Sequence, residues 1–156
     1  NNRSNQDIIS SIQRIKSELG ENLTILTHHY QRMEIVDLGD YRGDSFDLSQ
    51  KAAANGKAQY IVFCGVHFMA ESADILSTDH QDVILPDLTA GCRMADMATA
   101  ERVAECQAHL AEALDEPVMP VSYINSSAAI KKLTGRQRLR DQAYVENRLR
   151  DENYDF

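Results

Sequence analysis

Apolar residues recur along this chain with two different periods, which separates predicted helices from predicted strands. The spacing of Ile8, Ile12 and Ile15 predicts a helix over residues 6–19, which Gly20 should end. Further helices are predicted over residues 44–55, 68–76 and 94–114. Short apolar runs predict four strands, over residues 23–27, 60–64, 83–85 and 118–124.

An alternation of short strands and helices is typical of βαβ units, in which the strands run parallel. Right-handed crossovers then place helices on both faces of the sheet. We therefore expect an α/β fold with three layers, αβα, around a short parallel sheet of about four strands spanning residues 23–124. Pro120 cannot donate to a strand ladder, so the last strand is expected to lie at an edge or to start there.

Polar side chains cluster where each predicted strand ends. The carboxyl ends of parallel strands meet at one edge of a sheet, and ligands of open α/β sheets bind at that edge. Loops are polar in any protein, so ordinary surface loops are the alternative interpretation. The clusters are His28–Tyr30, Cys64-Gly65, Asp87–Cys92 and Tyr123–Ser127.

Gly43, Asp44 and Ser45 precede a predicted helix. A helix N-terminus offers unpaired N–H groups and the positive end of the dipole, so a phosphate or carboxylate group could bind there with the Ser45 hydroxyl as a further donor. The alternative is that Asp44 or Ser45 simply caps the helix, and the physics of the sequence favours the cap.

Cys92 is the cysteine best placed to bind a metal. It is predicted to lie at the start of the 94–114 helix beside Arg93, where a positive environment favours the thiolate that binds metals. One cysteine does not define an iron–sulfur site, because such clusters usually take several thiolates. Cys64, in a predicted strand, and Cys106, in a helix interior, are expected to be buried packing residues.

The histidines show no metal-ligand spacing. His28 and His29 are adjacent, so on an extended backbone they should point to opposite sides, with only one facing the edge of the sheet. His67, His80 and His109 have no companions at ligand spacing and are interpreted as structural or exposed.

Composition narrows the class of partner. The chain has 156 residues and a formal net charge of −8, which argues against electrostatic capture of nucleic acid. No apolar run approaches the ~18 residues that a membrane span needs. Three cysteines do not suggest a disulfide framework, so a reducing, cytoplasmic location is expected. Residues 132–156 are mostly polar and are expected to form a separate tail that packs poorly.

Several short motifs occur in a fixed order over roughly residues 20–131, and together they resemble the quinolinate synthases. Unrelated motifs that match in order are far more specific than any one of them. The motifs are His28-His29-Tyr30-Gln31, Glu34-Ile35, Asp37-Leu38, Gly43-Asp44-Ser45, Phe63–Glu71, Leu85-Pro86-Asp87, Ala90-Gly91-Cys92, Met94–Met97 and Tyr123–Ser126.

The resemblance implies a transferase of NAD (pyridine nucleotide) biosynthesis that condenses iminoaspartate with dihydroxyacetone phosphate to give quinolinate. It implies three similar α/β domains that share one 4Fe–4S cluster, with one cysteine from each domain and an open iron that acts as a Lewis acid. An L-aspartate oxidase that produces iminoaspartate is an expected partner. Nucleic acid and membrane are not expected partners.

The resemblance also implies roles for individual residues. Cys92 matches the cluster ligand of the first domain, and Tyr30 matches a tyrosine implicated in proton transfer. Contacts with substrate are implied for His28, Ser45, Tyr123, Ile124 and Asn125.

The resemblance ends after residue 131, where the family continues into a second and a third domain that carry the other cluster cysteines. The chain is therefore expected to be a first domain, with residues 132–156 unmatched, and to be inactive alone. Two alternatives stay open. One is a non-catalytic α/β module that binds a small anion, and the other is an interaction domain whose basic tail docks a protein partner.

Overall fold

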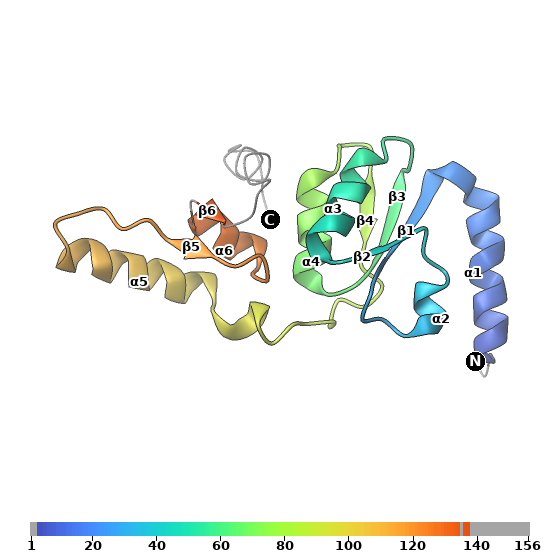
Figure 1. Cartoon of the computed structure of the whole chain (residues 1–156), viewed down its shortest axis with the longest axis horizontal. Helices are drawn as coiled ribbons and strands as arrows, with labels where there is room; N and C mark the ends of the chain where they lie inside the picture. Colours follow the sequence, from blue (N-terminus) through green and yellow to red (C-terminus); the bar gives the residue numbers. More distant parts are fainter. Residues whose placement is uncertain (1–2, 135, 138–156) are drawn as a thin grey trace.

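The computed structural model describes residues 3–134 and 136–137, and its centre is a four-stranded sheet in the order β2-β1-β3-β4 (Figure 1). Every neighbouring pair of strands in this sheet is parallel. The predicted parallel α/β architecture is therefore confirmed. The strands are β1 (Leu23–His28), β2 (Tyr41–Gly43), β3 (Tyr60–Cys64) and β4 (Asp82–Ile84).

Helices cover both faces of this sheet and give the predicted three layers. In Figure 1, α1 (Asn5–Leu19) and the short α2 (Met33–Val36) lie on one side, and α3 (Ser45–Ala54) and α4 (His67–Leu76) lie on the other. Gly20, with φ of 53°, ends α1 as predicted and starts the turn η1 (Gly20–Asn22). No helix in the described ranges is long and apolar enough to cross a membrane.

The face of the sheet that meets α3 and α4 is closed by apolar packing. Leu26 and Phe63 are fully buried there, against Leu48 of α3. Ala52 and Ala73, from α3 and α4, are also fully buried, and small side chains allow the two helices to approach each other. Burial of each large apolar side chain contributes ~1.5–3 kcal/mol, so this layer is the main source of stability.

The opposite face is covered less completely by α1. An apolar groove of about 520 Å³ remains between α1 and the sheet, lined by residues that include Ile15, Val62, Cys64 and Ile84. Ile15 and Ile84 are 43% and 44% exposed. The two faces of the sheet therefore differ strongly in how well they are packed.

The prediction that residues 118–124 form a strand of the main sheet is wrong. Within the described residues, this region forms β5 (Val121–Ser122), which pairs with β6 (Arg136–Gln137) in a separate two-stranded sheet. The fourth strand of the main sheet is β2, an edge strand with the sequence Tyr41-Arg42-Gly43. An exposed edge strand needs no apolar run, so the hydrophobic pattern could not reveal it.

The long helix predicted over residues 94–114 is divided into two. A 3₁₀ turn, η2 (Ala95–Met97), is followed by α5 (Ala100–Ala113). The Thr99 side chain accepts a hydrogen bond from the backbone N–H of Arg102. Thr99 is therefore the N-cap of α5, and the helix does not continue from η2. Figure 1 shows α5 extending away from the main sheet, and none of its residues is buried.

The last helix, α6 (Ala128–Leu133), packs on α4 and α5. The boundary predicted at residue 131 falls inside this helix. Residues 138–156, which make up most of the predicted tail, lie outside the described residues.

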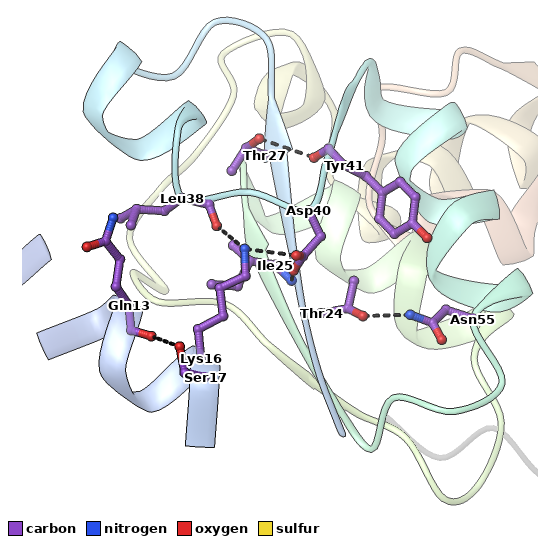
Figure 2. A network of polar contacts seen from close by, with 10 residues as sticks. All are labelled: Gln13, Lys16, Ser17, Thr24, Ile25, Thr27, Leu38, Asp40, Tyr41 and Asn55. Atoms are coloured by element: carbon purple, nitrogen blue, oxygen red, sulfur yellow. Dashed lines mark hydrogen bonds and ion pairs between the residues drawn. The ribbon is translucent and has the colours of Figure 1, made fainter. Parts of the chain in front are cut away.

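A polar network joins α1 to β1 and to the residue that precedes β2 (Figure 2). Asp40 N donates to Ile25 O, and Ile25 N donates to Asp40 Oδ2, both at 2.8 Å. Lys16 Nζ of α1 donates to Asp40 Oδ1 and to Leu38 O, also at 2.8 Å. Asp40 therefore continues the pairing of the two strands, and its carboxylate anchors the helix.

Two buried threonines of β1 fasten neighbouring elements (Figure 2). Thr24 Oγ1 accepts a 2.6 Å hydrogen bond from Asn55 Nδ2 at the end of α3, and Thr27 Oγ1 donates to Tyr41 O at 3.2 Å. Both hydroxyl groups thus have partners inside the fold, as buried polar groups require.

We expect Asp40→Ala to lower the free energy of unfolding by about 1–3 kcal/mol, because the N–H of Ile25 loses its acceptor and Lys16 loses its partner. Asp40→Asn keeps an acceptor oxygen and should cost less. Urea unfolding followed by circular dichroism measures both changes. The control is Arg14→Ala, which removes the exposed pair with Glu18 on the same helix and should cost less than about 0.5 kcal/mol. Equal losses for Asp40→Ala and the control would contradict this role.

Candidate functional site

Three ring side chains stack where β1 ends. His28 is the last residue of β1 and is 5% exposed, whereas Tyr30 is 52% exposed. The ring centroid of His28 lies 3.9 Å from that of Tyr30 and 4.2 Å from that of His29. The chain turns directly after His28, so the two histidines lie side by side. The expectation that they point to opposite sides is wrong, because it assumed an extended backbone.

His29 is fixed to the neighbouring strand β2. Its backbone N–H donates to Gly43 O at 3.2 Å, and its Nδ1 lies 3.1 Å from the same oxygen. A Cβ atom at position 43 would collide with the carboxylate of Asp47. Glycine therefore leaves room for the Asp47 carboxylate, which would otherwise have to rotate away.

Burial and, to a smaller extent, the charge of the neighbouring His29 lower the pKa of His28 to about 4, although Asp44 acts in the opposite direction. The imidazole is therefore neutral at pH 7. The backbone N–H of Tyr30 donates to His28 Nδ1 over 3.4 Å. A ring nitrogen that accepts carries no proton, so this contact places the proton of the neutral ring on Nε2. His28 can thus donate one hydrogen bond to an acceptor on a ligand.

Asp44 is the N-cap of α3, since its Oδ1 accepts a 3.0 Å hydrogen bond from Asp47 N. The interpretation that this segment caps a helix is confirmed. Ser45 follows as the first residue of α3 and is half-buried. Asp44 acts electrostatically on His28, so the start of α3 and the end of β1 belong to one neighbourhood.

Cys92 lies close to Tyr30. Burial raises the pKa of Tyr30, and the charge of Cys92 raises it further, so the phenol stays protonated at neutral pH. The Tyr30 hydroxyl also lies 4.0 Å from Met69 Sδ. Cys92 is half-buried in the loop before η2 and packs against the core. The structure therefore brings His28, Tyr30 and Cys92 together at the carboxyl edge of the sheet.

The position of Cys92 differs from the prediction in one respect. It lies in a loop instead of at the start of a long helix, because the continuous helix begins only after Thr99. The backbone oxygen of Cys92 accepts a 2.9 Å hydrogen bond from Asp96 N, which holds the loop in place.

The other two cysteines differ from each other. Cys64 is half-buried, and burial raises the pKa of its thiol, in line with a packing role. Cys106 is exposed, so the expectation that it is buried is wrong. The reason is that α5 buries none of its residues.

The remaining histidines have structural or surface positions, as expected. His80 Nδ1 lies 2.8 Å from Thr78 Oγ1, and its Nε2 lies 3.2 Å from Gly56 O. His67 Nδ1 lies 3.6 Å from a carboxylate oxygen of Glu71. His109 is exposed on α5.

Tyr123, Ile124 and Asn125 follow β5 in a tight turn. Tyr123 is 65% exposed. Tyr123 and Asn125 line a cavity of about 870 Å³ between α5 and the segment that follows it, and Met94 and Ala95 line the same cavity. Met94 is two residues from Cys92, so the loop of Cys92 links this second group of residues to the first.

Sequence reasoning gave no role to Glu71 or Lys131. Lys131 is 3% exposed, and the Glu71 carboxylate accepts a hydrogen bond from the first residue of α6. The sequence offered a signal for Glu71, which is the last residue of the Phe63–Glu71 motif, and none for Lys131.

A metal site is not complete within the residues that the structure describes, which hold no group of three or more histidine, cysteine or acidic side chains suited to a metal ion. Cys92 can offer one thiolate, the ligand type that iron–sulfur clusters use. Its place beside Tyr30 at the sheet edge fits the contribution of a single ligand to a shared group.

The unusual pKa of His28 should make stability depend on pH. The folded protein binds fewer protons than the unfolded chain between pH 4 and 6.5, so the free energy of unfolding should fall as the pH falls through this range. The loss is at most about 3 kcal/mol between pH 7 and pH 4. Urea unfolding of the wild type and of His28→Asn at both pH values isolates the contribution of His28 to the free energy of unfolding. An equal pH dependence in the two proteins would contradict it.

Comparison with known proteins agrees with the resemblance. The family model described as quinolinate synthetase A protein matches residues 10–138. A quinolinate synthase of Streptomyces coelicolor is 58% identical over 134 residues, which cover 85% of this chain and 34% of that protein. Quinolinate synthases of Bacillus cereus and Bacillus thuringiensis are 51% and 50% identical over 133 residues, covering 85% of this chain and 36% of each relative.

This chain spans about a third of the length of the curated relatives that it matches. The match nevertheless runs from within α1 to β6 and includes both groups of polar residues described above. The chain therefore belongs to the quinolinate synthetase A protein family.

Proposed function

We propose that this chain forms the first α/β domain of a quinolinate synthase, a transferase of NAD biosynthesis. The complete enzyme would condense iminoaspartate with dihydroxyacetone phosphate to give quinolinate. The observation that carries the proposal is the grouping of His28, Tyr30 and Cys92 at the carboxyl edge of the parallel sheet. That edge is where open α/β sheets bind their ligands.

His28 and Ser45 would bind the anionic groups of the substrates. The neutral imidazole of His28 offers a proton on Nε2 to a carboxylate or phosphate oxygen. Ser45 places a hydroxyl at the first turn of α3, where the helix dipole also favours negative charge. A neutral donor suits this role because it needs no counter-charge when the substrate is absent.

Tyr30 would hold and deliver a proton. Its raised pKa keeps the phenol protonated at neutral pH, and its half-exposed position leaves the hydroxyl accessible to a substrate. Tyr123, Ile124 and Asn125 would contact substrate from the second group of residues. Asn125 can donate and accept hydrogen bonds through its amide.

Cys92 would supply one thiolate ligand to a 4Fe–4S cluster, and the other ligands would come from parts of the enzyme beyond this domain. When bound, such a cluster supplies a Lewis-acidic iron that favours loss of water. One thiolate holds a cluster poorly, so this chain alone should make no quinolinate. An L-aspartate oxidase is the proposed source of iminoaspartate, and a reducing, cytoplasmic setting would keep the three free cysteines reduced.

The test of the proposal is a chimera in which this chain replaces the matching third of the Streptomyces coelicolor relative. After anaerobic loading with iron and sulfide, the chimera should form quinolinate, and Cys92→Ala should reduce both the bound iron and the turnover by at least about 10-fold, since altering a residue that only supports a metal ligand already costs about 10- to 100-fold. Cys106→Ala alters an exposed thiol on α5, which extends away from the main sheet and from the His28–Tyr30 group (Figure 1), and is the matched control for the ligand role. If Cys92→Ala kept the cluster and the turnover of the control, the ligand assignment would be lost.

A second variant tests the role of Tyr30. Tyr30→Phe removes the hydroxyl but keeps the ring that stacks on His28, so the chimera should keep its fold and lose about 100-fold or more in kcat, the usual contribution of a positioned proton donor. Steady-state assays with dihydroxyacetone phosphate varied give kcat and KM separately. An unchanged kcat in Tyr30→Phe would exclude proton transfer by this residue.

A further inference from the structure

A lysine is buried where α6 packs on α4. Lys131 is 3% exposed, its Nζ donates to Ser72 Oγ at 3.0 Å, and the same atom lies 5.4 Å from the centroid of the Phe68 ring. Burial of an ammonium group is unfavourable unless hydrogen bonds and an opposite charge compensate it. A lysine at this position therefore depends on a nearby carboxylate.

Glu71 provides that carboxylate and performs a second task with it. Glu71 Oε2 accepts a 3.0 Å hydrogen bond from Ala128 N, the first residue of α6, and Oε1 lies 3.6 Å from His67 Nδ1. Burial lowers the pKa of Lys131 to about 8, and the charge of Glu71 acts in the opposite direction. One side chain of α4 thus caps α6 and offsets the charge that α6 buries.

A short turn connects α6, which packs on α4, to the proposed substrate-contacting residues 123–125. Ser126 is buried, its Oγ donates to Tyr123 O and its N–H donates to Ile124 O, both at 2.8 Å. Ser127, the next residue, is the N-cap of α6. Tyr123 is mostly exposed, so its own packing does not fix it. Its position follows from the place of α6 on α4.

We propose that Glu71 and Lys131 are positioning residues, which hold α6 on α4 and thereby fix Tyr123, Ile124 and Asn125 for the substrate. The link to substrate rests on the proposed function. The docking of α6 itself does not.

The charge that acts on Lys131 is that of Glu71. Within the described residues, His67 of α4 pairs with Glu71, and α5 meets α6 through the neutral Gln107, which donates to Leu133 O. β5 contributes the neutral Ser122, whose hydroxyl lies 2.7 Å from that of Thr134. Because docking lowers the pKa of Lys131 below its ordinary value of 10.5, docking should strengthen as the pH rises from about 8 to 10.5.

The test uses the full chain and nuclear magnetic resonance without any ligand. Amide hydrogen exchange of Ala128 and Lys131 at pH 7 should become roughly 10- to 100-fold faster in Glu71→Ala, the effect of losing a hydrogen bond to a charged group. Glu71→Gln retains an acceptor for Ala128 N and should restore part of the protection. Lys131→Met, added to Glu71→Ala, should also restore protection, because it removes the uncompensated charge. If the two side chains acted independently of each other, their separate losses of protection would add.

Two further readouts sharpen the test. The side-chain carbon resonance of Lys131 should titrate near pH 8 and at a lower pH in Glu71→Gln. The amide resonances of Tyr123, Ile124 and Asn125 should shift in Glu71→Ala and stay in place in Lys132→Met, an exposed control on the same helix. Unchanged resonances of the main sheet show that each variant is folded. Exchange in Glu71→Ala within twofold of the wild type, or additive losses in the double variant, would overturn the proposal.

Titration of the same samples with dihydroxyacetone phosphate separates this proposal from the proposed function. The expected result is a shift of the Tyr123–Asn125 resonances in the wild type and at least tenfold weaker binding in Glu71→Ala. If α6 is docked in the wild type but the resonances of residues 123–125 do not shift, these residues do not contact the substrate and their positioning has no role in binding it. Equal affinity in the two proteins overturns the positioning role while the substrate role stands.

Discussion

The parallel pairing of β1 with the strands on both of its sides is the constraint on which the rest of the structure depends. His28 pairs with Gly43 of β2, and Thr27 pairs with Cys64 of β3. This register sets the last residue of β1 beside the start of α3 and brings the loops after all of these strands to one edge. A shift by one residue would reverse the faces of β1. Leu26 would then leave the core, and His28 would lose its place in the site.

Much of the fold could be predicted from periodicity, because its elements obey local rules. The helical spacing in α1, the apolar runs of β1 and β3 and the capping residue Asp44 each act within a few residues. Strand β2 was missed because an exposed edge strand has no apolar pattern. The run at residues 118–124 was assigned to the wrong sheet, since sequence alone does not say which strands are neighbours.

The candidate site could also be predicted from the sequence only in part. Rules for parallel sheets predicted that residues after β1 and β4 would meet, and His28, Tyr30 and Cys92 do so. The stacking of His28 on His29 could not be predicted, because it depends on the turn that begins at the end of β1. The burial of Lys131 was also beyond sequence reasoning. It arises only when α6 docks on a helix that lies more than fifty residues earlier in the chain.

The three cysteines lie in three different parts of the structure. Alkylation of these native thiols can therefore report on each part separately. Cys106 on α5 is open to an alkylating reagent without any unfolding. Cys64 is half-buried and lines the apolar groove between α1 and the sheet, and burial raises the pKa of its thiol, so it should be alkylated more slowly than Cys106. Cys92 is also half-buried, but it lies at the carboxyl edge of the sheet, near Tyr30. The rates at which the three thiols react would thus report separately on α5, on the groove under α1 and on the carboxyl edge of the sheet, with no foreign probe introduced.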